Sequence, residues 1–299
     1  MANIDPSCSS ITAVLVSYNS TRVLAAALDS IEALEHIIVV DNGSSDGSAE
    51  LARQRCPRAR VIEAGANLGF GRANNLALEA VQTEHALLLN PDCEMQPGAF
   101  AALIEASRRY PEAAIWGPKI YDAPGVLGLC YRPAFYKPQP KELIDPQGDL
   151  CTEFLTGAAM LLNMRLMRQV GFFDPWFFLY LEDDDLCERA RRAGHPLVLI
   201  NDAHALHRVR QSSAPSMRLS YRRAYCMTLS KFYMQYKYFG PLSSAGTMLR
   251  VGIGSLLMLP INALTLKSER VARSAARLVA SLVAPMRVRA ERCLPQPPR

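Results

Sequence analysis

The stretch ITAVLVSYNSTRVLAAALDSIEALEHIIVVDNGSSDGS, residues 11–48, decides the fold of this chain. Two continuous apolar runs, at 11–17 and 36–41, enclose a helical stretch from Ser20 to about Leu34. Ser20 has the short hydroxyl side chain that favours the start of a helix. Apolar runs joined by a helix are typical of parallel strands that are covered on both faces.

The same alternation continues through the first half of the chain. Further strand candidates lie at 59–64, 85–90 and 113–119. The expected helices begin near Asp46, within 69–82 and near Pro97. This pattern predicts an α/β domain with a mostly parallel, doubly wound sheet, in which ligands bind beyond the carboxyl ends of the strands.

The second half of the chain is less regular. Six prolines between residues 118 and 150 predict a loop over a site. The elements expected after this loop are a strand at 154–163, a short helix at 164–171, a helix from Glu182 to about Ala193 and a strand at 196–201.

Length and composition set the class of protein. With 299 residues, of which 49% are apolar and 20% charged, the chain suits one large domain or one domain with an appendage. The first ten residues have neither a basic region nor an apolar run, so we expect no secretory leader. The eight cysteines are scattered without a C-x-x-C pair, which indicates reduced cytosolic thiols and argues against zinc.

The charge is distributed unevenly, although the net charge is only +5. From His204 onward there are 16 basic and two acidic residues, whereas the preceding part has 17 basic and 26 acidic ones. A basic tail behind an acidic body favours a polyanion or an anionic membrane surface as a neighbour. A solvated basic face is the alternative.

The tail is also apolar. The uncharged run at 251–266 is shorter than the ~20 residues of a spanning helix, and Pro260 interrupts it. Beyond it, the apolar residues at helical spacing among arginines are Val271, Ala275, Leu278 and Leu282. We therefore expect residues 216–299 to form a helical extension that lies in a membrane interface. A helix packed on its own domain is the alternative.

Polar residues collect where the predicted strands end. They are Tyr18 and Asn19, Asp41 and Asn42, and Asn90 and Asp92. Each could belong to a simple turn, since Asp-Asn-Gly is a turn signal by itself. Three such strand ends in one sheet outline a nucleotide site, because an acid there can bind a ribose, a base N–H or a metal that holds phosphates.

Two further polar signals are weaker. In NLGFGRANN, residues 67–75, Asn74 stands where a dinucleotide fingerprint needs its third glycine, so a dehydrogenase is a poor interpretation. His207 could be a metal ligand, but a lone histidine is more often a satisfied or exposed side chain.

The stretch FFLYLEDDDLCERARRAG, residues 177–194, places four acids behind an apolar run. Acids in the first turn of a helix are favoured by its dipole. We expect Asp185–Arg189 and Glu188–Arg192 to pair on the solvated face of this helix. Asp183 lies one turn before Leu186 on the inward stripe, where a carboxylate beside aromatic groups suits a general base.

The chain resembles the family 2 inverting glycosyltransferases of GT-A fold, and is most similar to their rhamnosyltransferase-like branch, which acts on lipid-linked cell-wall and O-antigen precursors. The resemblance spans about residues 11–240. The motifs that carry it are VSYNS at 16–20, VVDNGSSDGS at 39–48, NLGFGRANN at 67–75, LLNPDCE at 88–94, TGAAMLLN at 156–163, VGFFDPWFFLYLEDDDLCERARRAG at 170–194 and HALHRVRQSS at 204–213.

The resemblance assigns roles to individual residues. Asp41 would contact the base or ribose of a nucleotide-sugar donor. The other donor-side residues would be Tyr18, Asn19, Asn42, Asn67, Gly69, Arg72, Asn74 and Asn90. Asp92 would bind the metal ion together with His207, because Asn90 replaces the first acid of the D-x-D-type motif. Asp183, preceded by Glu182, would be the catalytic base. Gly157 and Trp176 would shape the acceptor side.

These roles imply an inverting transferase that uses Mg²⁺ or Mn²⁺. The expected donor is dTDP-L-rhamnose and the expected acceptor a polyprenyl-diphosphate-linked saccharide. UDP-galactofuranose or a UDP-hexose as donor, a nucleotidyltransferase and a scaffold protein with a worn site are the alternatives. The catalytic domain would be 1–215, with a donor half at 1–117 and an acceptor half at 118–215. We expect a cytoplasmic, peripheral membrane protein that binds no nucleic acid.

Overall fold

The computed structural model describes residues 9–208, 216–265 and 268–291, with side chains up to residue 287. The first ten residues, in which no secretory leader was expected, lie almost wholly outside the described residues. Residues 209–213 of the motif at 204–213 also lie outside them. The described chain forms two compact units. One comprises the residues up to 176 together with 182–208, and the other comprises 177–181 together with the residues from 216 onward.

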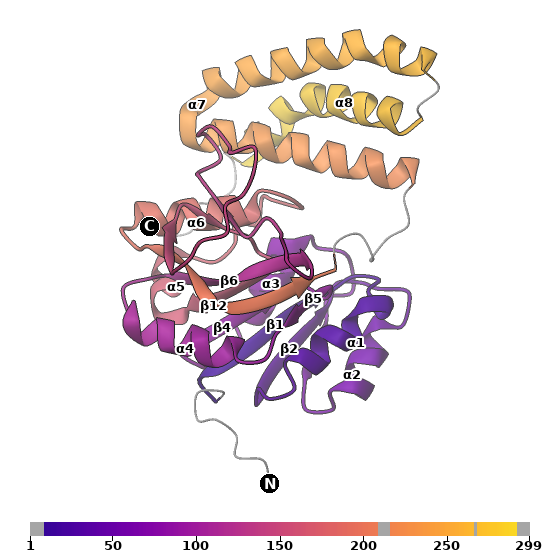
Figure 1. The fold of residues 1–299 in the computed structure, drawn as a ribbon. Coiled ribbons are helices and arrows are strands. Elements are labelled where there is room, and N and C mark those ends of the chain that lie inside the picture. Colours follow the sequence, from indigo (N-terminus) through magenta and orange to yellow (C-terminus); the bar gives the residue numbers. More distant parts are fainter. Residues whose placement is uncertain (1–8, 209–215, 266–267, 292–299) are drawn as a thin grey trace. The chain divides into compact units, whose positions relative to one another are not determined.

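The first unit is a layered α/β domain built on one large mixed sheet (Figure 1). Its helices are α1 (Thr21–Ser30), α2 (Ser48–Arg55), α3 (Phe70–Leu78), α4 (Ala99–Arg109), α5 (Met164–Val170) and α6 (Glu182–Arg192). The strands of its main path, in spatial order, are β3 (Arg60–Glu63), β2 (His36–Asp41), β1 (Ile11–Ser17), β4 (His85–Leu89), β11 (Ala159–Asn163), β6 (Ile115–Ala123), β12 (Leu197–His207) and β5 (Cys93–Met95).

The way in which the strands pair explains why the polar residues at their carboxyl ends meet at one edge of the sheet. Strands β3, β2, β1 and β4 are mutually parallel, and β6 is parallel to β12. Strand β11 runs antiparallel between β4 and β6, with Ala159 opposite Leu89. The start of β11 therefore lies beside the end of β4, where the Asn90 N–H donates to the Ala158 carbonyl at 2.8 Å.

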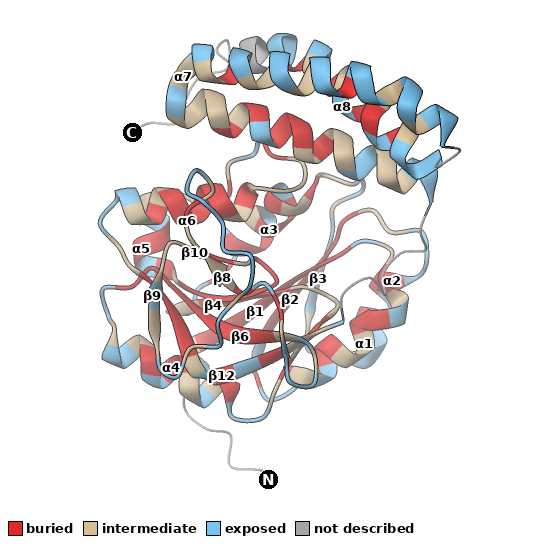
Figure 2. Cartoon of the chain, turned by 45° about the horizontal axis from the view of Figure 1, so that its top comes forward, coloured by how far each residue is buried: buried red, intermediate tan, exposed pale blue. Residues whose placement is uncertain are grey.

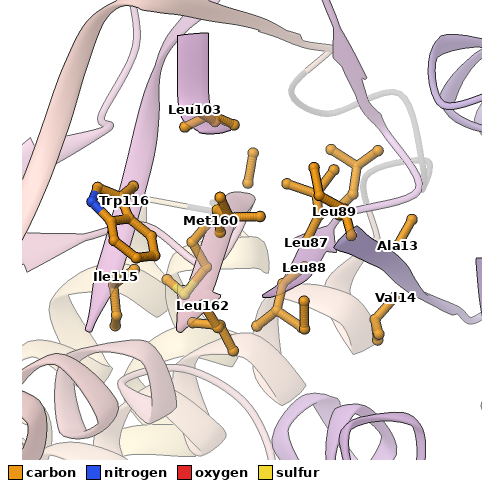
Figure 3. Packing of buried hydrophobic residues seen from close by; sticks show 14 of the residues in the cluster. Ala13, Val14, Leu87, Leu88, Leu89, Leu103, Ile115, Trp116, Met160 and Leu162 are labelled. Atoms are coloured by element: carbon orange, nitrogen blue, oxygen red, sulfur yellow. The ribbon is translucent and has the colours of Figure 1, made fainter. Parts of the chain in front are cut away.

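The sheet is held by apolar side chains on both of its faces. Every residue of β1 is buried, as expected for a strand covered on both sides. In Figure 3, Leu87 and Leu89 point to one face of β4 and Leu88 to the other. Trp116 of β6 packs toward Leu103 of α4 and is fully buried. This continuous core fixes the register of the strands and hence the positions of their polar ends.

The predicted elements are found, but several differ in their bounds. Strand β12 continues to His207 although it was predicted to end at residue 201, and α3 ends at Leu78 rather than near residue 82. Helix α1 ends at Ser30 rather than near Leu34, although Leu34 is still buried in the core. The strand expected at 154–163 is divided, because residues 156–158 form a turn between β10 (Phe154–Leu155) and β11. Strand β5 was not predicted, since three residues are too few to show a periodic pattern.

The proline-rich segment 118–150 is only partly a loop. Its first residues complete β6, whose range extends to Ala123. The short strands after it are β7 (Val126–Leu127), β8 (Tyr131–Arg132) and β9 (Leu150–Thr152). Strand β8 pairs with β10 in a small separate sheet, with Leu155 opposite Tyr131 and Phe154 opposite Arg132. This pairing brings Arg132 next to the polypeptide that leads into β11.

The second unit is helical. Helix α7 (Met217–Leu264) doubles back at Gly240, which has φ +83° and precedes Pro241, and α8 (Ser268–Glu291) packs on it (Figure 1). The residues of α8 buried at four-residue spacing are Ala272, Ala276, Ala280 and Ala284. Among the described residues, α7 is the one helix long and apolar enough to cross a membrane, and only 6% of its apolar window is buried.

The turn after β2 generates a prediction about stability. Gly43 has φ +76°, and a Cβ there would lie 2.8 Å from the Ala66 carbonyl carbon. Gly65 has a similar φ of +71° but nothing within 4 Å of such a Cβ. We expect Gly43→Ala to lower the free energy of unfolding by about 2–4 kcal/mol, since it adds a clash to backbone strain. Gly65→Ala, as the control, should lower it by about 1 kcal/mol. Urea unfolding measures both values, and an equal loss of stability in the two variants would contradict the close approach of Gly43 to the Ala66 backbone.

Candidate active site

The ends of β1 and β2 present two buried polar atoms toward the carboxyl edge of the sheet. Asp41 is 5% exposed, and its Oδ2 accepts a hydrogen bond from the Ser44 N–H at 3.0 Å. Within the described part of the chain, Asp41 Oδ1 has no hydrogen-bond partner, and neither has the hydroxyl of Ser17, the residue paired with it in register. Buried polar atoms are nearly always paired, so this pair suits a ligand that supplies an N–H or O–H group.

Asn19 and Tyr18 follow β1 and differ in what they can do. Asn19 has φ +51°, its Oδ1 accepts from the Ser45 N–H at 2.9 Å and its own N–H donates to Ser44 Oγ. It therefore joins the loop after β1 to the loop after β2. Tyr18 is 40% exposed and stands at the rim of this edge.

Two of the predicted donor-side amides shape the turn before α3. Asn42 Oδ1 accepts from the Leu68 N–H at 2.8 Å, and Asn42 Nδ2 donates to the Gly69 carbonyl. Asn67 Oδ1 accepts from the Gly69 N–H at 3.1 Å. These bonds fasten the turn at 67–69 to the end of β2.

Helix α3 carries the remaining donor-side residues and one that the prediction missed. Asn74 is buried and donates from Nδ2 to the carbonyl one turn earlier, so it acts within the helix. Arg72 Nε donates to the Pro175 carbonyl at 2.6 Å. Asn75, which was not singled out, donates to the Phe173 carbonyl and accepts from the Phe173 N–H. Arg72 and Asn75 together hold the segment before Trp176 against α3.

Asp92 and His207 lie together, as the resemblance implied. His207 Nε2 is 3.2 Å from Asp92 Oδ1, and the Arg208 N–H donates to the Asp92 carbonyl at 2.8 Å. The two side chains come together because β12 pairs with β5, which begins directly after Asp92. The described residues contain no group of three or more metal-ligating side chains.

This pair of residues fits a divalent cation. Magnesium-type ions commonly take one or two protein ligands, and substrate phosphates and water complete their coordination. A carboxylate with an imidazole suits Mn²⁺ as well, and both side chains are partly exposed. Two ligands that both lie at the ligand-binding edge leave room for a diphosphate.

The first turn of α6 places Asp183 beside Gly157. Asp183 Oδ2 accepts from the Gly157 N–H at 3.2 Å, and Oδ1 accepts from the Asp184 N–H at 3.0 Å. A Cβ at Gly157 would lie 3.5 Å from the Asp183 Cβ, at ordinary van der Waals distance, so the two residues are direct neighbours. Burial raises the pKa of Asp183, whereas the two backbone donors favour its charged form.

The prediction that Asp183 is the most inward acid was wrong. Asp183 is half-buried, whereas Asp184, Asp185 and Glu188 are each at most 5% exposed. The expected i,i+4 pairs are present, with Arg189 Nε 2.8 Å from Asp185 and Arg192 Nε 2.7 Å from Glu188, but their carboxylates are buried and not solvated. Ion pairing allows these acids to be buried, whereas Asp183 remains partly exposed.

Glu182 is buried without an ion pair among the described residues. Its Oε2 atom has no hydrogen-bond partner in that part of the chain. Burial, reinforced by the neighbouring charge of Asp183, raises the pKa of Glu182 to about 8. Glu182 is therefore mostly protonated at neutral pH.

Arg132 is the second residue that sequence reasoning missed. Its Nη2 is 2.5 Å from Asp184 Oδ1, and its guanidinium lies 3.8 Å from the centre of the Phe154 ring. Its positive charge also lowers the pKa of Asp183. It lies in the proline-rich segment, 52 residues before its partner, so no local spacing could have indicated the pair.

The Asp92–His207 pair predicts how the protein binds Mn²⁺. We expect His207→Phe to weaken Mn²⁺ binding at least tenfold in the presence of UDP or dTDP, because it removes one of two protein ligands. His204→Gln is the matched control, since His204 is on the same strand, is exposed and contacts the Asn201 carbonyl instead. Electron paramagnetic resonance of free Mn²⁺ measures both affinities. An equal affinity in the two variants would exclude His207 as a ligand.

Comparisons with known proteins identify the family of the chain. The chain is 31% identical over 217 residues to the N-acetylglucosaminyl-diphospho-decaprenol L-rhamnosyltransferase of Mycobacterium tuberculosis H37Rv, which covers 62% of this chain and 70% of the relative. It is 27% identical over 221 residues to rhamnosyltransferase WbbL of Escherichia coli K12, with 65% and 81% covered.

A solved structure shares the fold. The mannosyltransferase PcManGT of Pyrobaculum calidifontis, in complex with GDP-Man and Mn²⁺, superposes with a TM-score of 0.54 at 15% identity, over 92% of this chain and 87% of that one. This similarity shows the GT-A fold that the strand pattern and motifs predicted. The model of glycosyl transferase family 2 matches residues 12–171, more than half of the chain. The chain belongs to glycosyl transferase family 2 and is a glycosyltransferase.

Proposed function

We propose that this protein is an inverting transferase that moves L-rhamnose from dTDP-L-rhamnose to a polyprenyl-diphosphate-linked saccharide. The observation that supports it most is the position of Asp183. Its carboxylate accepts from the Gly157 N–H, and the next carbonyl, that of Ala158, accepts from Asn90 at the end of β4. Two residues further along is Asp92. The base and the Asp92–His207 pair are thus joined through one short stretch of backbone.

In this proposal Asp183 takes the proton of the acceptor hydroxyl as its oxygen attacks the anomeric carbon. Asp183 is suited to this because burial raises its pKa, which favours uptake of a proton, and because two backbone N–H groups hold its carboxylate in place. Attack from the side opposite the leaving nucleoside diphosphate inverts the anomeric centre in one displacement. A divalent cation, when bound, acts as a Lewis acid that stabilises the diphosphate as it leaves. Asp92 and His207 would hold it.

The donor nucleotide would occupy the half of the unit that contains β1 to β4, within residues 1–117. Asp41 Oδ1 would accept the N–H of a pyrimidine base, a group that thymine and uracil share. Asp41 alone therefore does not separate dTDP from UDP donors. The preference for rhamnose rests on the two rhamnosyltransferase relatives. The acceptor would enter from the half at 118–215, past Gly157 and Trp176.

The apolar, basic second unit supports a membrane-associated enzyme. Helix α7 has an apolar window of which only 6% is buried, and basic residues greatly outnumber acidic ones beyond His204. Such a surface suits a peripheral position on the anionic inner face of the cell membrane, where a lipid-linked acceptor would be found.

A donor panel tests the substrate assignment. We expect turnover with dTDP-L-rhamnose to exceed that with UDP-galactofuranose and UDP-glucose at least a hundredfold, because binding differences of 3 kcal/mol or more separate true donors from analogues that leave polar groups unpaired. Product formation on a polyprenyl-diphosphate N-acetylglucosamine acceptor is measured by mass spectrometry, and the anomeric configuration by NMR. A retained configuration or a preference for a UDP-sugar would overturn the corresponding part of the proposal.

The roles of the two adjacent acids can be separated. We expect Asp183→Asn to lower kcat by about 10³-fold or more while the donor nucleotide still binds, because the base is lost and the shape is kept. Glu182→Gln should retain activity within about threefold, since Glu182 is already neutral and its amide replacement has the same shape. Single-turnover transfer and nucleotide binding by calorimetry give both values. Normal turnover by Asp183→Asn would remove it as the base.

A further inference from the structure

The second unit contains a hollow of about 390 Å³ where three helical segments meet. The first arm of α7, its second arm after Gly240, and α8 all contribute to its wall. Each segment supplies one basic residue to the lining, namely Lys231, Arg250 and Arg277. Three cations from three different segments of helix converge on one hollow.

The cations of this hollow have no counter-charge among the described side chains. Glu269 is the only acid in the described side chains from residue 216 to 287, and it pairs with Arg273. Lys231, Arg250 and Arg277 make no ion pair in that part of the chain. Like charges that share one site repel one another, so an anion bound there would stabilise the arrangement.

Hydroxyl groups complete the polar lining. Thr228, Thr247, Ser255 and Ser274 all border the hollow. Ser274 Oγ accepts from Asn262 Nδ2 at 2.9 Å, which leaves its own proton available to donate. Arginine, lysine and hydroxyl donors together are the usual partners of phosphate oxygens, and arginine can bind them in a bidentate manner.

An exposed apolar face adjoins the hollow on the same helix. The second arm of α7 turns the lining positions 250, 251, 254 and 258 toward the hollow. The neighbouring face of this arm exposes large apolar side chains, and Figure 2 shows α7 with long stretches of exposed surface. These side chains, each at least half exposed, are Leu249, Ile253, Leu256, Leu257, Ile261 and Leu264. A ligand that carries both a phosphate and a hydrocarbon chain matches both features.

We propose that this hollow binds the phosphate headgroup of a membrane lipid, while the apolar face of α7 contacts the hydrocarbon chains. The inference rests on the membrane association proposed above and adds a defined site to it. General attraction between a basic surface and an anionic bilayer would depend on total charge. Binding at a defined site depends instead on which basic residues are removed. Variants that lose the same total charge at different positions can therefore test the proposal.

The test compares two triple variants of the full-length protein that lose the same charge. The pocket variant is Lys231→Gln, Arg250→Gln and Arg277→Gln. The control variant is Arg218→Gln, Arg223→Gln and Arg270→Gln, at exposed residues of the same unit that do not line the hollow. Binding is measured by sedimentation with vesicles of phosphatidylcholine alone, with phosphatidylglycerol added, or with undecaprenyl phosphate added. Circular dichroism and thermal unfolding establish that both variants fold.

We expect the pocket variant to lose at least roughly 25-fold in affinity for one or both phosphate-rich vesicles, because it loses the charge-assisted hydrogen bonds to a bound phosphate in addition to the general attraction of its charges. The control variant should lose clearly less, and millimolar pyrophosphate should weaken binding of the wild type only. The vesicle that shows the larger difference identifies the lipid. Equal losses in both variants, or no vesicle binding by the wild type, would overturn the inference. Neither result concerns glycosyl transfer in detergent, which tests the proposed function separately.

Discussion

The first turn of α6 must accommodate a row of carboxyl groups in a largely buried place, and the site depends on how this is done. Asp184, Asp185 and Glu188 are neutralised by arginines. Glu182 has no such partner in the described chain and keeps its proton. Asp183 is partly exposed and accepts hydrogen bonds from two backbone N–H groups. The pairing of the charges thus separates the structural acids from the one acid that we propose as the base.

The arginines that neutralise these acids also position the surrounding loops. Arg189, besides its bond to Asp185, donates to the carbonyls of Val170, Gly171 and Phe172. It thereby caps the end of α5 and fixes the start of the segment that leads to Trp176. Asn75 of α3 holds the next residue of that segment from the other side. A change in this polar network would consequently move the acceptor side together with the base.

The strands and their polar ends could be predicted from the sequence because they follow a local pattern. Asp41 and Asp92 end apolar runs, and the parallel topology alone brings such ends together. The partners of the acids could not be predicted in this way. Arg132 reaches Asp184 only through the pairing of β8 with β10, and the burial of Asp185 depends on tertiary packing. Helical spacing correctly identified the i,i+4 pairs but did not indicate which side of α6 is covered.

The segment directly before α6 has a strained backbone that is held by contacts within the second unit. Tyr180 and Leu181 have φ values of +74° and +65°, which lie in the left-handed region of the backbone. This conformation costs roughly 1–3 kcal/mol for each residue that is not a glycine. The second unit supplies the compensating interactions, since Ser230 Oγ donates to the Leu179 carbonyl and the buried Phe177 ring packs edge-on against Tyr233. The strained backbone ends where α6 begins at Glu182.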